Sequence, residues 1–295
     1  MVLGFSLAIL SSVFSTLYVI PRKKAMQKPM HYMVGFGAGY FVTSLIFYSG
    51  HVISQGRNAE TFFNPVLFVS ALGGLVFMTG SLFYCTAIDK IGLSRSNQWK
   101  SLSGPLSSTL ILFFFAEYKT TNYAYIIIAT GTIFISAVLF SIREDTGNAV
   151  DRKGIIYAVI TAAFFGFNGI VMKYVSNRGL FYPHFVGHSF ILLSTALGYI
   201  LIREGSLKAL REISAKDNIL AFSGGVLQFF ASYTGIKSFS FITGSIAATL
   251  LQFTAVWTVL TGIFIFKEVN FAKNKLRIIA GFIFTIAGAV LLLLA

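Results

Sequence analysis

Long apolar segments separated by short polar ones follow one another along the whole chain of 295 residues. Each is about 20 residues long, which is the length an α-helix needs to cross a hydrocarbon core about 30 Å thick. The segments lack the ten-residue alternation of outer-membrane β-strands. The pattern therefore predicts an all-α membrane protein. Its ten transmembrane helices cover residues 2–20, 33–54, 66–88, 93–115, 123–142, 154–175, 185–202, 219–238, 242–266 and 276–294.

Small, aromatic and charged residues recur in the same order in the two halves of the chain, at a separation of 150 or 151 residues. The matched pairs are Gly4 and Gly154, Ala8 and Ala158, Phe14 and Phe164, Lys23 and Lys173, Gly73 and Gly224, Gly74 and Gly225, Ser81 and Ser232, Ser94 and Ser245, Phe115 and Phe266, and Glu117 and Glu268. Five helices are thus repeated as five, and because five is odd, the second copy starts from the opposite face of the membrane. We expect a five-plus-five inverted repeat, residues 1–146 and 147–295, with a substrate site between the halves.

Charge is sparse and lies mostly in the loops. The chain is 56% hydrophobic and 11% charged, with a mean hydropathy of +0.78, whereas soluble domains are about 25% charged. Seventeen of the 23 Lys and Arg residues lie on the side of the odd-numbered loops and five on the other side, which predicts cytoplasmic odd loops and external termini. The net charge of +13 is thus explained by topology in a cell membrane rather than by nucleic acid. The single cysteine, Cys85, excludes an internal disulfide and offers no metal cluster.

The fourth span carries a polar face that is unusual at membrane depth. On a helix, the following side chains fall within roughly 80° of one another: Ser94, Asn97, Gln98, Ser101 and Ser108. The equivalent positions in the ninth span are Ser245, Ala248, Thr249 and Gln252. Because amides and hydroxyls both donate and accept hydrogen bonds, the two stripes predict a neutral cavity for a polyhydroxylated ligand. The alternative is that these groups hold helices together; Ser103 and Ser107 lie off the face and are expected to pack.

Three further residues of the fourth span have distinct expected roles. Lys100 sits about two turns into the membrane, where it could bind an anionic group or a hydroxyl, or extend to the cytoplasmic face. Trp99 points away from the polar stripe. Pro105 has no amide donor, so it should kink the helix and free a carbonyl at that depth.

Other spans supply isolated candidates for binding. Asn168 and Gln228 are lone amides in apolar helices, and amides of this kind are costly unless they meet a cavity or a partner. Tyr84 and Tyr233 could stack on a sugar ring, although packing is the commoner role of such tyrosines.

Titratable candidates are few. Asp89 and His188 could couple transport to protons, although Asp89 could instead pair with Lys90 or Arg95. His184 and His188 are four residues apart but have no third ligand nearby in the sequence, so no metal is expected. Glu117 and Glu268 occupy equivalent helix ends, where a carboxylate is unfavourable without a partner such as Lys119 or Lys267, and we interpret both as architectural.

Together these features resemble the drug/metabolite transporter superfamily, and within it the glucose/ribose porter and rhamnose-symporter branch of sugar uptake proteins. The motifs that carry the resemblance are Tyr18-Val19-Ile20-Pro21-Arg22-Lys23-Lys24, Tyr84-x-x-Ala87-Ile88-x-x-Ile91-Gly92-Leu93-Ser94, Phe115-Ala116-Glu117 and Phe264-x-Phe266-Lys267-Glu268. The resemblance implies proton- or gradient-driven alternating access between two five-helix halves. Many members of other branches have both termini inside, which conflicts with the charge count.

The sequence thus predicts a secondary transporter for a small polar solute, in particular a sugar, with protons as a possible coupling ion. An exporter of amino acids or drugs and a non-transporting membrane scaffold remain alternatives. The chain contains no phosphate-cradling glycine loop, HExxH motif or nucleophile elbow, so neither an enzyme nor a cofactor is expected. Monomer and dimer are both compatible with the sequence.

Overall fold

A computed structural model describes residues 1–56, 65–140, 151–267 and 270–295, but not the side chain of Ser94. All regular elements in these ranges are helices. They are α1 (Val2–Leu17), α2 (Val19–Lys24), α3 (Pro29–Gln55), α4 (Val66–Ile91), α5 (Leu93–Lys100), α6 (Ser103–Phe114), a 3-10 turn (Glu117–Lys119), α7 (Tyr123–Leu139), α8 (Arg152–Arg178), α9 (Phe181–Glu204), α10 (Lys208–Arg211), α11 (Ala215–Ser238), α12 (Gly244–Leu250), a 3-10 turn (Leu251–Phe253), α13 (Thr254–Phe264) and α14 (Phe271–Leu293).

Within the described ranges, eight helical stretches are long and apolar enough to cross a membrane. The fifth predicted span is the shorter apolar helix α7, and the fourth is divided into α5 and α6. The remaining predicted spans each correspond to one of the eight stretches. The chain is therefore an all-helical, multi-pass membrane protein.

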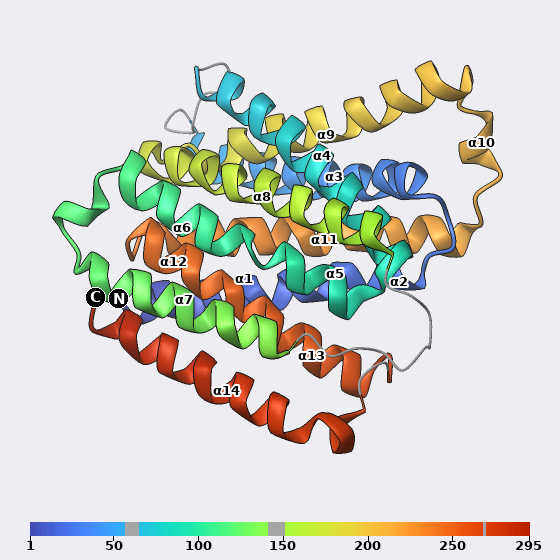
Figure 1. Cartoon of the computed structure of the whole chain (residues 1–295). Helices are drawn as coiled ribbons and strands as arrows, with labels where there is room; N and C mark the ends of the chain where they lie inside the picture. Colours follow the sequence, from blue (N-terminus) through green and yellow to red (C-terminus); the bar gives the residue numbers. More distant parts are fainter. Residues whose placement is uncertain (57–64, 141–150, 268–269) are drawn as a thin grey trace.

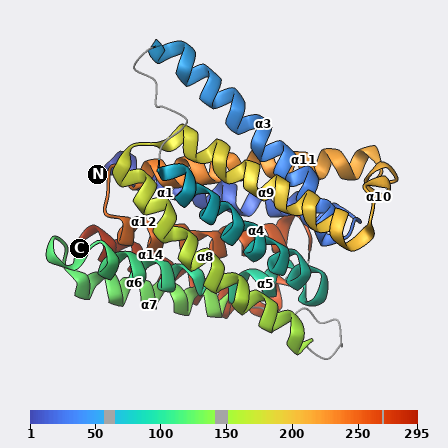
Figure 2. The same ribbon diagram turned by 90° about the horizontal axis from the view of Figure 1, so that it is seen from above.

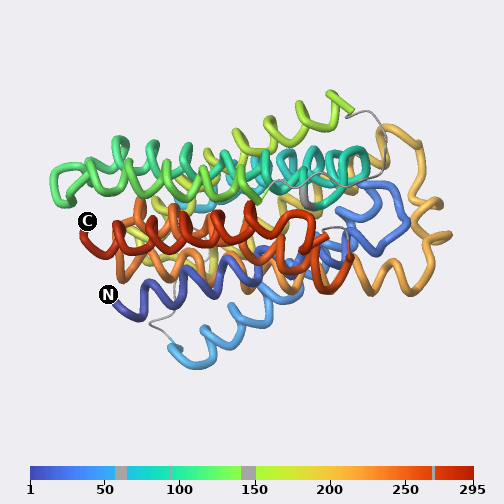
Figure 3. The backbone as a smooth tube through the Cα atoms, turned by 60° about the horizontal axis from the view of Figure 1, so that its bottom comes forward, coloured from blue at the N-terminus to red at the C-terminus, as the bar shows by residue number. Residues whose placement is uncertain are grey.

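The long helices run side by side as one bundle, with both chain ends at the same end of it (Figures 1 and 3). We call this the terminal end; there the amide of Asn122 donates to the carbonyl of Ala295 (3.0 Å). The other end holds α2, and we call it the basic end because Arg22, Lys23 and Lys24 lie there. At the terminal end, α3 leans away from the bundle (Figure 2).

Contacts between helices follow a regular scheme. α4 packs on α8 as α11 packs on α1, and α3 packs on α11 as α9 packs on α4. α3 also contacts α9, α6 contacts α12, and α7 contacts α14. Each contact is therefore reproduced when every helix is replaced by the one about 150 residues away.

Two glycines allow helices from opposite halves of the chain to touch backbone to backbone. A Cβ on Gly74 of α4 would lie 2.4 Å from the carbonyl oxygen of His188 on α9, and one on Gly225 of α11 would lie 1.9 Å from that of Phe36 on α3. Any larger residue would separate these pairs. Gly74 and Gly225 are themselves 151 residues apart, so the two crossings are equivalent.

Two helices are interrupted near their middles, again at equivalent positions. α5 ends at Lys100 and α6 begins at Ser103, whereas α12 and α13 are separated by the 3-10 turn Leu251–Phe253. Pro105 is expected to kink the fourth span, and the interruption lies in the turn before it. Pro105 lies in the first turn of α6, where a missing amide donor is tolerated, and the break precedes it.

Candidate functional site

A cavity of about 130 Å³ lies between the two halves, at the level of the two interruptions. Its polar lining residues are Ser11, Ser15, Lys100, Ser101, Ser103, Ser107, Asn168, Gln228, Ser232, Gln252 and Thr254. Aromatic rings of Tyr18, Phe77, Phe165 and Phe239 complete much of the wall. By volume, the cavity corresponds to on the order of ten water molecules, since one water needs about 10–15 Å³ of such space. It is large enough for one small polar solute.

Gln252 binds the backbone at the break of the fourth span. With its amide oriented to satisfy both groups, Nε2 donates to the carbonyl of Ser101 (2.7 Å) and Oε1 accepts from the amide of Gly104 (2.8 Å). Ser101 is four residues before Pro105, which has no amide to donate to its carbonyl; the carbonyl instead accepts from the Gly104 amide at 3.3 Å and from Gln252. Gly104 is required here, because a Cβ would lie 0.6 Å from the side-chain amide of Gln252.

Asn168 of α8 and Gln228 of α11 present amide oxygens that find no hydrogen-bond donor among the described residues. Both side chains are buried and both line the cavity. Gln228 donates from Nε2 to the hydroxyl of Ser232 (2.9 Å), which leaves its oxygen available. Since buried polar groups without partners are rare in native proteins, these two oxygens are an unusual feature of the cavity wall.

Lys100 projects into the cavity rather than toward the basic end. Its Nζ lies 4.9 Å from the ring centroid of Tyr84, 5.7 Å from that of Phe165 and 6.0 Å from that of Tyr18. The residue is 8% exposed. The structure thus favours the binding alternative for Lys100 over extension to the cytoplasmic face.

Neutral hydrogen bonds close the cavity toward the basic end. Asn97 donates from Nδ2 to the hydroxyl of Thr258 on α13 (2.9 Å) and accepts at Oδ1 from the hydroxyl of Tyr84 (3.1 Å). All three side chains are buried. Asn97 and Tyr84 therefore lie next to the cavity, behind Lys100, rather than in its wall.

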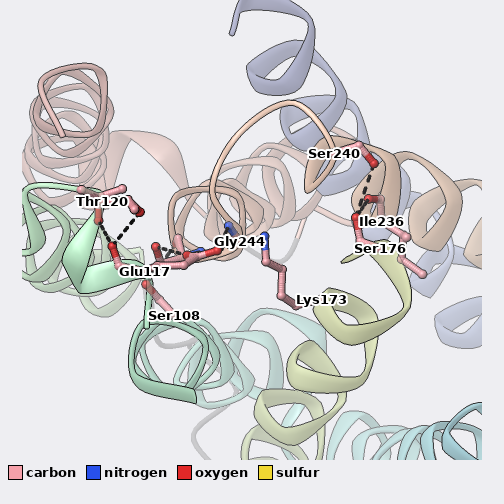
Figure 4. Close-up of polar contacts among 10 residues, drawn as sticks. Ser108, Glu117, Thr120, Lys173, Ser176, Ile236, Ser240 and Gly244 are labelled. Carbon is pink, nitrogen blue, oxygen red and sulfur yellow. Dashed lines mark hydrogen bonds and ion pairs between the residues drawn. The ribbon is translucent and has the colours of Figure 1, made fainter. Parts of the chain in front are cut away.

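An ion pair closes the structure toward the terminal end (Figure 4). The Glu117 carboxylate accepts from the backbone amides of Gly244 and Ser245 (both 2.8 Å) and from the Ser245 hydroxyl (2.7 Å). Lys173 of α8 pairs with it at 2.9 Å, one residue beyond Met172 in the cavity wall. Burial alone would raise the pKa of Glu117, but Lys173 and the Ser245 hydrogen bonds outweigh burial, so its pKa lies below the usual value.

The architectural interpretation of Glu117 fits this geometry, although its partner is Lys173 and not the neighbouring Lys119. Glu117 also neutralises the N-terminus of α12, which carries partial positive charge. Its repeat counterpart, Glu268, lies outside the described residues.

Other predicted site residues lie outside the cavity wall. Thr249 is buried and donates to Ser108 and the carbonyl of Ser245. Gln98 is half-buried and does not line the cavity. The side chain of Ser94 is not described.

The two candidates for proton coupling are also outside the wall. Asp89 pairs with Arg22 of α2, whereas Lys90, expected as a partner, pairs instead with Asp151 (2.9 Å). His188 lies between the rings of Tyr40 and Phe77, and its Nδ1 has no partner in the described part of the chain.

Seven polar or tyrosine residues of the cavity wall are not among the predicted site residues: Ser11, Ser15, Tyr18, Ser103, Ser107, Ser232 and Thr254. Ser103 and Ser107 reach the cavity because the break after Lys100 changes the phase of the helix. Ser11 and Ser15 are four residues apart on one face of an apolar span, which was a usable signal. Ser232 was recognised only as a repeat partner of Ser81.

The fold and the cavity define a multi-pass helical membrane protein with a polar compartment between two sets of helices. A protein-family model described as "Sugar transport protein" matches residues 6–295. The chain belongs to this family, and the resemblance to sugar uptake proteins is thereby confirmed. A solved structure titled only as the crystal structure of a protein matches with a TM-score of 0.70 and 12% identity, over 99% of this chain and 97% of that one, which shows the fold alone. No curated protein matches the chain.

Proposed function

We propose that this protein is a secondary transporter of the cell membrane that moves one sugar molecule at a time by alternating access. The observation that carries the proposal is the pair of unpartnered oxygens of Asn168 and Gln228 in a buried cavity. Sugar hydroxyls supply the donors that these oxygens lack. Membership of a sugar transport family supports the same solute class.

The proposal includes a five-plus-five inverted repeat, residues 1–146 and 147–295. Three observations support it. The contacts between helices recur when each helix is replaced by the one about 150 residues away. The glycine crossings at Gly74 and Gly225 are equivalent, and so are the helix breaks near Ser101 and Gln252. Such repeats place substrate at the interface of the halves, next to interrupted helices. The cavity lies at this position.

The alternatives are less well supported by the site. An exporter of cationic drugs or amino acids would be favoured by acidic residues in the cavity, and the described wall contains none. A scaffold would be favoured by amides that satisfy one another, whereas Asn168 and Gln228 each leave an oxygen unpaired.

The test is uptake of labelled sugars and amino acids into proteoliposomes, with and without a pH gradient. Asn168→Leu and Gln228→Leu should each reduce sugar uptake by about tenfold or more, because each leaves a solute hydroxyl unpaired in the bound state. The matched controls are Asn177→Leu, also on α8, and Gln55→Leu, both exposed, which should transport normally. Uptake of amino acids alone, or normal sugar uptake by both cavity variants, would contradict the proposal. Dependence on the pH gradient would identify protons as the coupling ion.

The orientation is part of the proposal: odd loops inside, both termini outside. In a Cys85→Ala background, cysteine at Met26 should react with an impermeant maleimide only from the cytoplasmic side, and cysteine at Tyr118 only from outside. Both positions are exposed, at 94% and 40%. The opposite labelling pattern would reverse the orientation without affecting the site.

A further inference from the structure

Lys100 is a buried cation in the wall of the cavity. Its Nζ is surrounded by the faces of Tyr84, Phe165 and Tyr18, and it makes neither a hydrogen bond nor an ion pair with any described residue. Cation–π contacts compensate part of the lost hydration. They are much weaker than the full cost of burying an ammonium ion.

The acidic residues of the described chain are engaged or distant. Asp89 pairs with Arg22, Glu117 with Lys173, Asp151 with Lys90, and Glu204 with His31. Of the other two, Glu212 is exposed, and the half-buried Asp217 accepts from the Met26 amide and the Ser214 hydroxyl. None of them lines the cavity. Within this part of the protein, Lys100 therefore lacks an anionic partner, and a bound solute could provide one.

We propose that the transported solute is an acidic monosaccharide whose carboxylate binds Nζ of Lys100. This inference rests on the proposed sugar transport and narrows its substrate class. A single ammonium matches the single charge of a carboxylate, whereas phosphate sites usually present several donors. In the same cavity, the oxygens of Asn168 and Gln228 accept from the sugar hydroxyls.

The aromatic part of the wall fits the same ligand. Phe77 and Phe165 lie nearly parallel, with centroids 5.2 Å apart and planes at 13°. Both rings line the cavity and give it an apolar surface, with Phe165 beside Lys100. The C–H face of a pyranose ring packs on such a surface. The ligand thus meets an apolar face, two acceptors and one cation, which a neutral sugar would satisfy only in part.

The experiment compares matched pairs of labelled sugars in proteoliposomes: glucose with glucuronate, and galactose with galacturonate. Each pair differs at one carbon. The wild-type protein should take up one or both acids with a half-saturation concentration at least about tenfold lower than that of the neutral sugar, because the charge-assisted bond is added. Lys100→Met should remove this preference, and Lys100→Arg should retain part of it.

Lys237→Met is the matched control. Lys237 also lies over an aromatic ring, 4.0 Å from the centroid of Phe181, but outside the cavity, so its replacement should leave the acid preference intact. Uptake of neutral sugars in preference to the acids, or an acid preference that survives in Lys100→Met, would overturn this inference and leave sugar transport standing. Absence of uptake for all four sugars would count against both. If Lys100→Met fails to fold, the wild-type preference and Lys100→Arg still decide.

Discussion

Replacing Gly104 with alanine should reduce solute uptake to background and lower the melting temperature of the purified protein. The added Cβ would lie 0.6 Å from the side-chain amide of Gln252, so the Gln252 side chain has to leave its position. Its two hydrogen bonds at the break, to Ser101 and Gly104, are then lost. The Ser101 carbonyl and the Gly104 amide then keep only their long mutual hydrogen bond of 3.3 Å, and a lost hydrogen bond costs about 0.5–1.5 kcal/mol. Both residues lie in the cavity wall. Uptake in proteoliposomes and thermal unfolding in detergent measure the two effects.

Two variants make this prediction specific. Gly198→Ala, in the middle of α9, places its Cβ where no atom lies within 4 Å, so it should be neutral or slightly stabilising. The double variant Gly104→Ala, Gln252→Ala removes the collision and should recover part of the melting temperature. A Gly104→Ala protein with normal melting and uptake would show that Gln252 does not occupy the break.

Replacing Glu117 with alanine should destabilise the protein by about 3–5 kcal/mol, the usual cost of removing one partner of a buried ion pair. The change leaves Lys173 buried without its counter-ion, at 7% exposure, and removes the acceptor for the Gly244 and Ser245 amides. Denaturant unfolding in detergent measures the loss. Lys173→Met should have a similar effect, and the double variant should lose less than the two single variants together.

The pH dependence of the protein's stability distinguishes the effect of the Glu117 charge from the effect of the side chain's shape. The pKa of Glu117 is lowered in the folded protein. Its contribution to the free energy of unfolding is therefore complete at pH values above the unfolded pKa of about 4.3, and it is lost as the pH falls through the folded pKa. Glu117→Gln keeps the shape and should lack this acid-induced loss. Lys119→Met, at an exposed position next to the pair, should behave like the wild type. An equal loss of stability on acidification in Glu117→Gln would show that the carboxylate is not the titrating group.

The helices could be predicted from the sequence because the bilayer permits few backbone conformations. Apolar runs of membrane length form helices so that every backbone group is satisfied within the segment. The third predicted span, 66–88, accordingly matches α4 (Val66–Ile91) closely. The 3-10 turn Leu251–Phe253 has no such signal, because no proline accompanies it. Only the distance of 151 residues between Ser101 and Gln252 indicates that turn.

The cavity could be predicted only in part. Asn168 and Gln228 are predictable because burying a lone amide in an apolar helix is unfavourable unless it has a hydrogen-bond partner or faces a cavity. Both residues line the cavity. Asn97 and Thr249 gave the same signal but hydrogen-bond to neighbouring helices. A helical wheel cannot distinguish these outcomes, since it contains no neighbours and assumes an unbroken helix. The Arg22–Asp89 pair joins residues 67 apart, which local spacing cannot reveal.

The backbone crossings at Gly74 and Gly225 limit how the two halves could move. At each crossing a helix of one half rests directly on a carbonyl of the other, with no flexible side chain between them to compress or extend. Sliding would bring a Cβ against the opposing chain, whereas rotation about the crossing keeps the contact intact. The two crossings would therefore act as pivots for a rotation of one half against the other, in which closing the bundle at its terminal end opens it at its basic end.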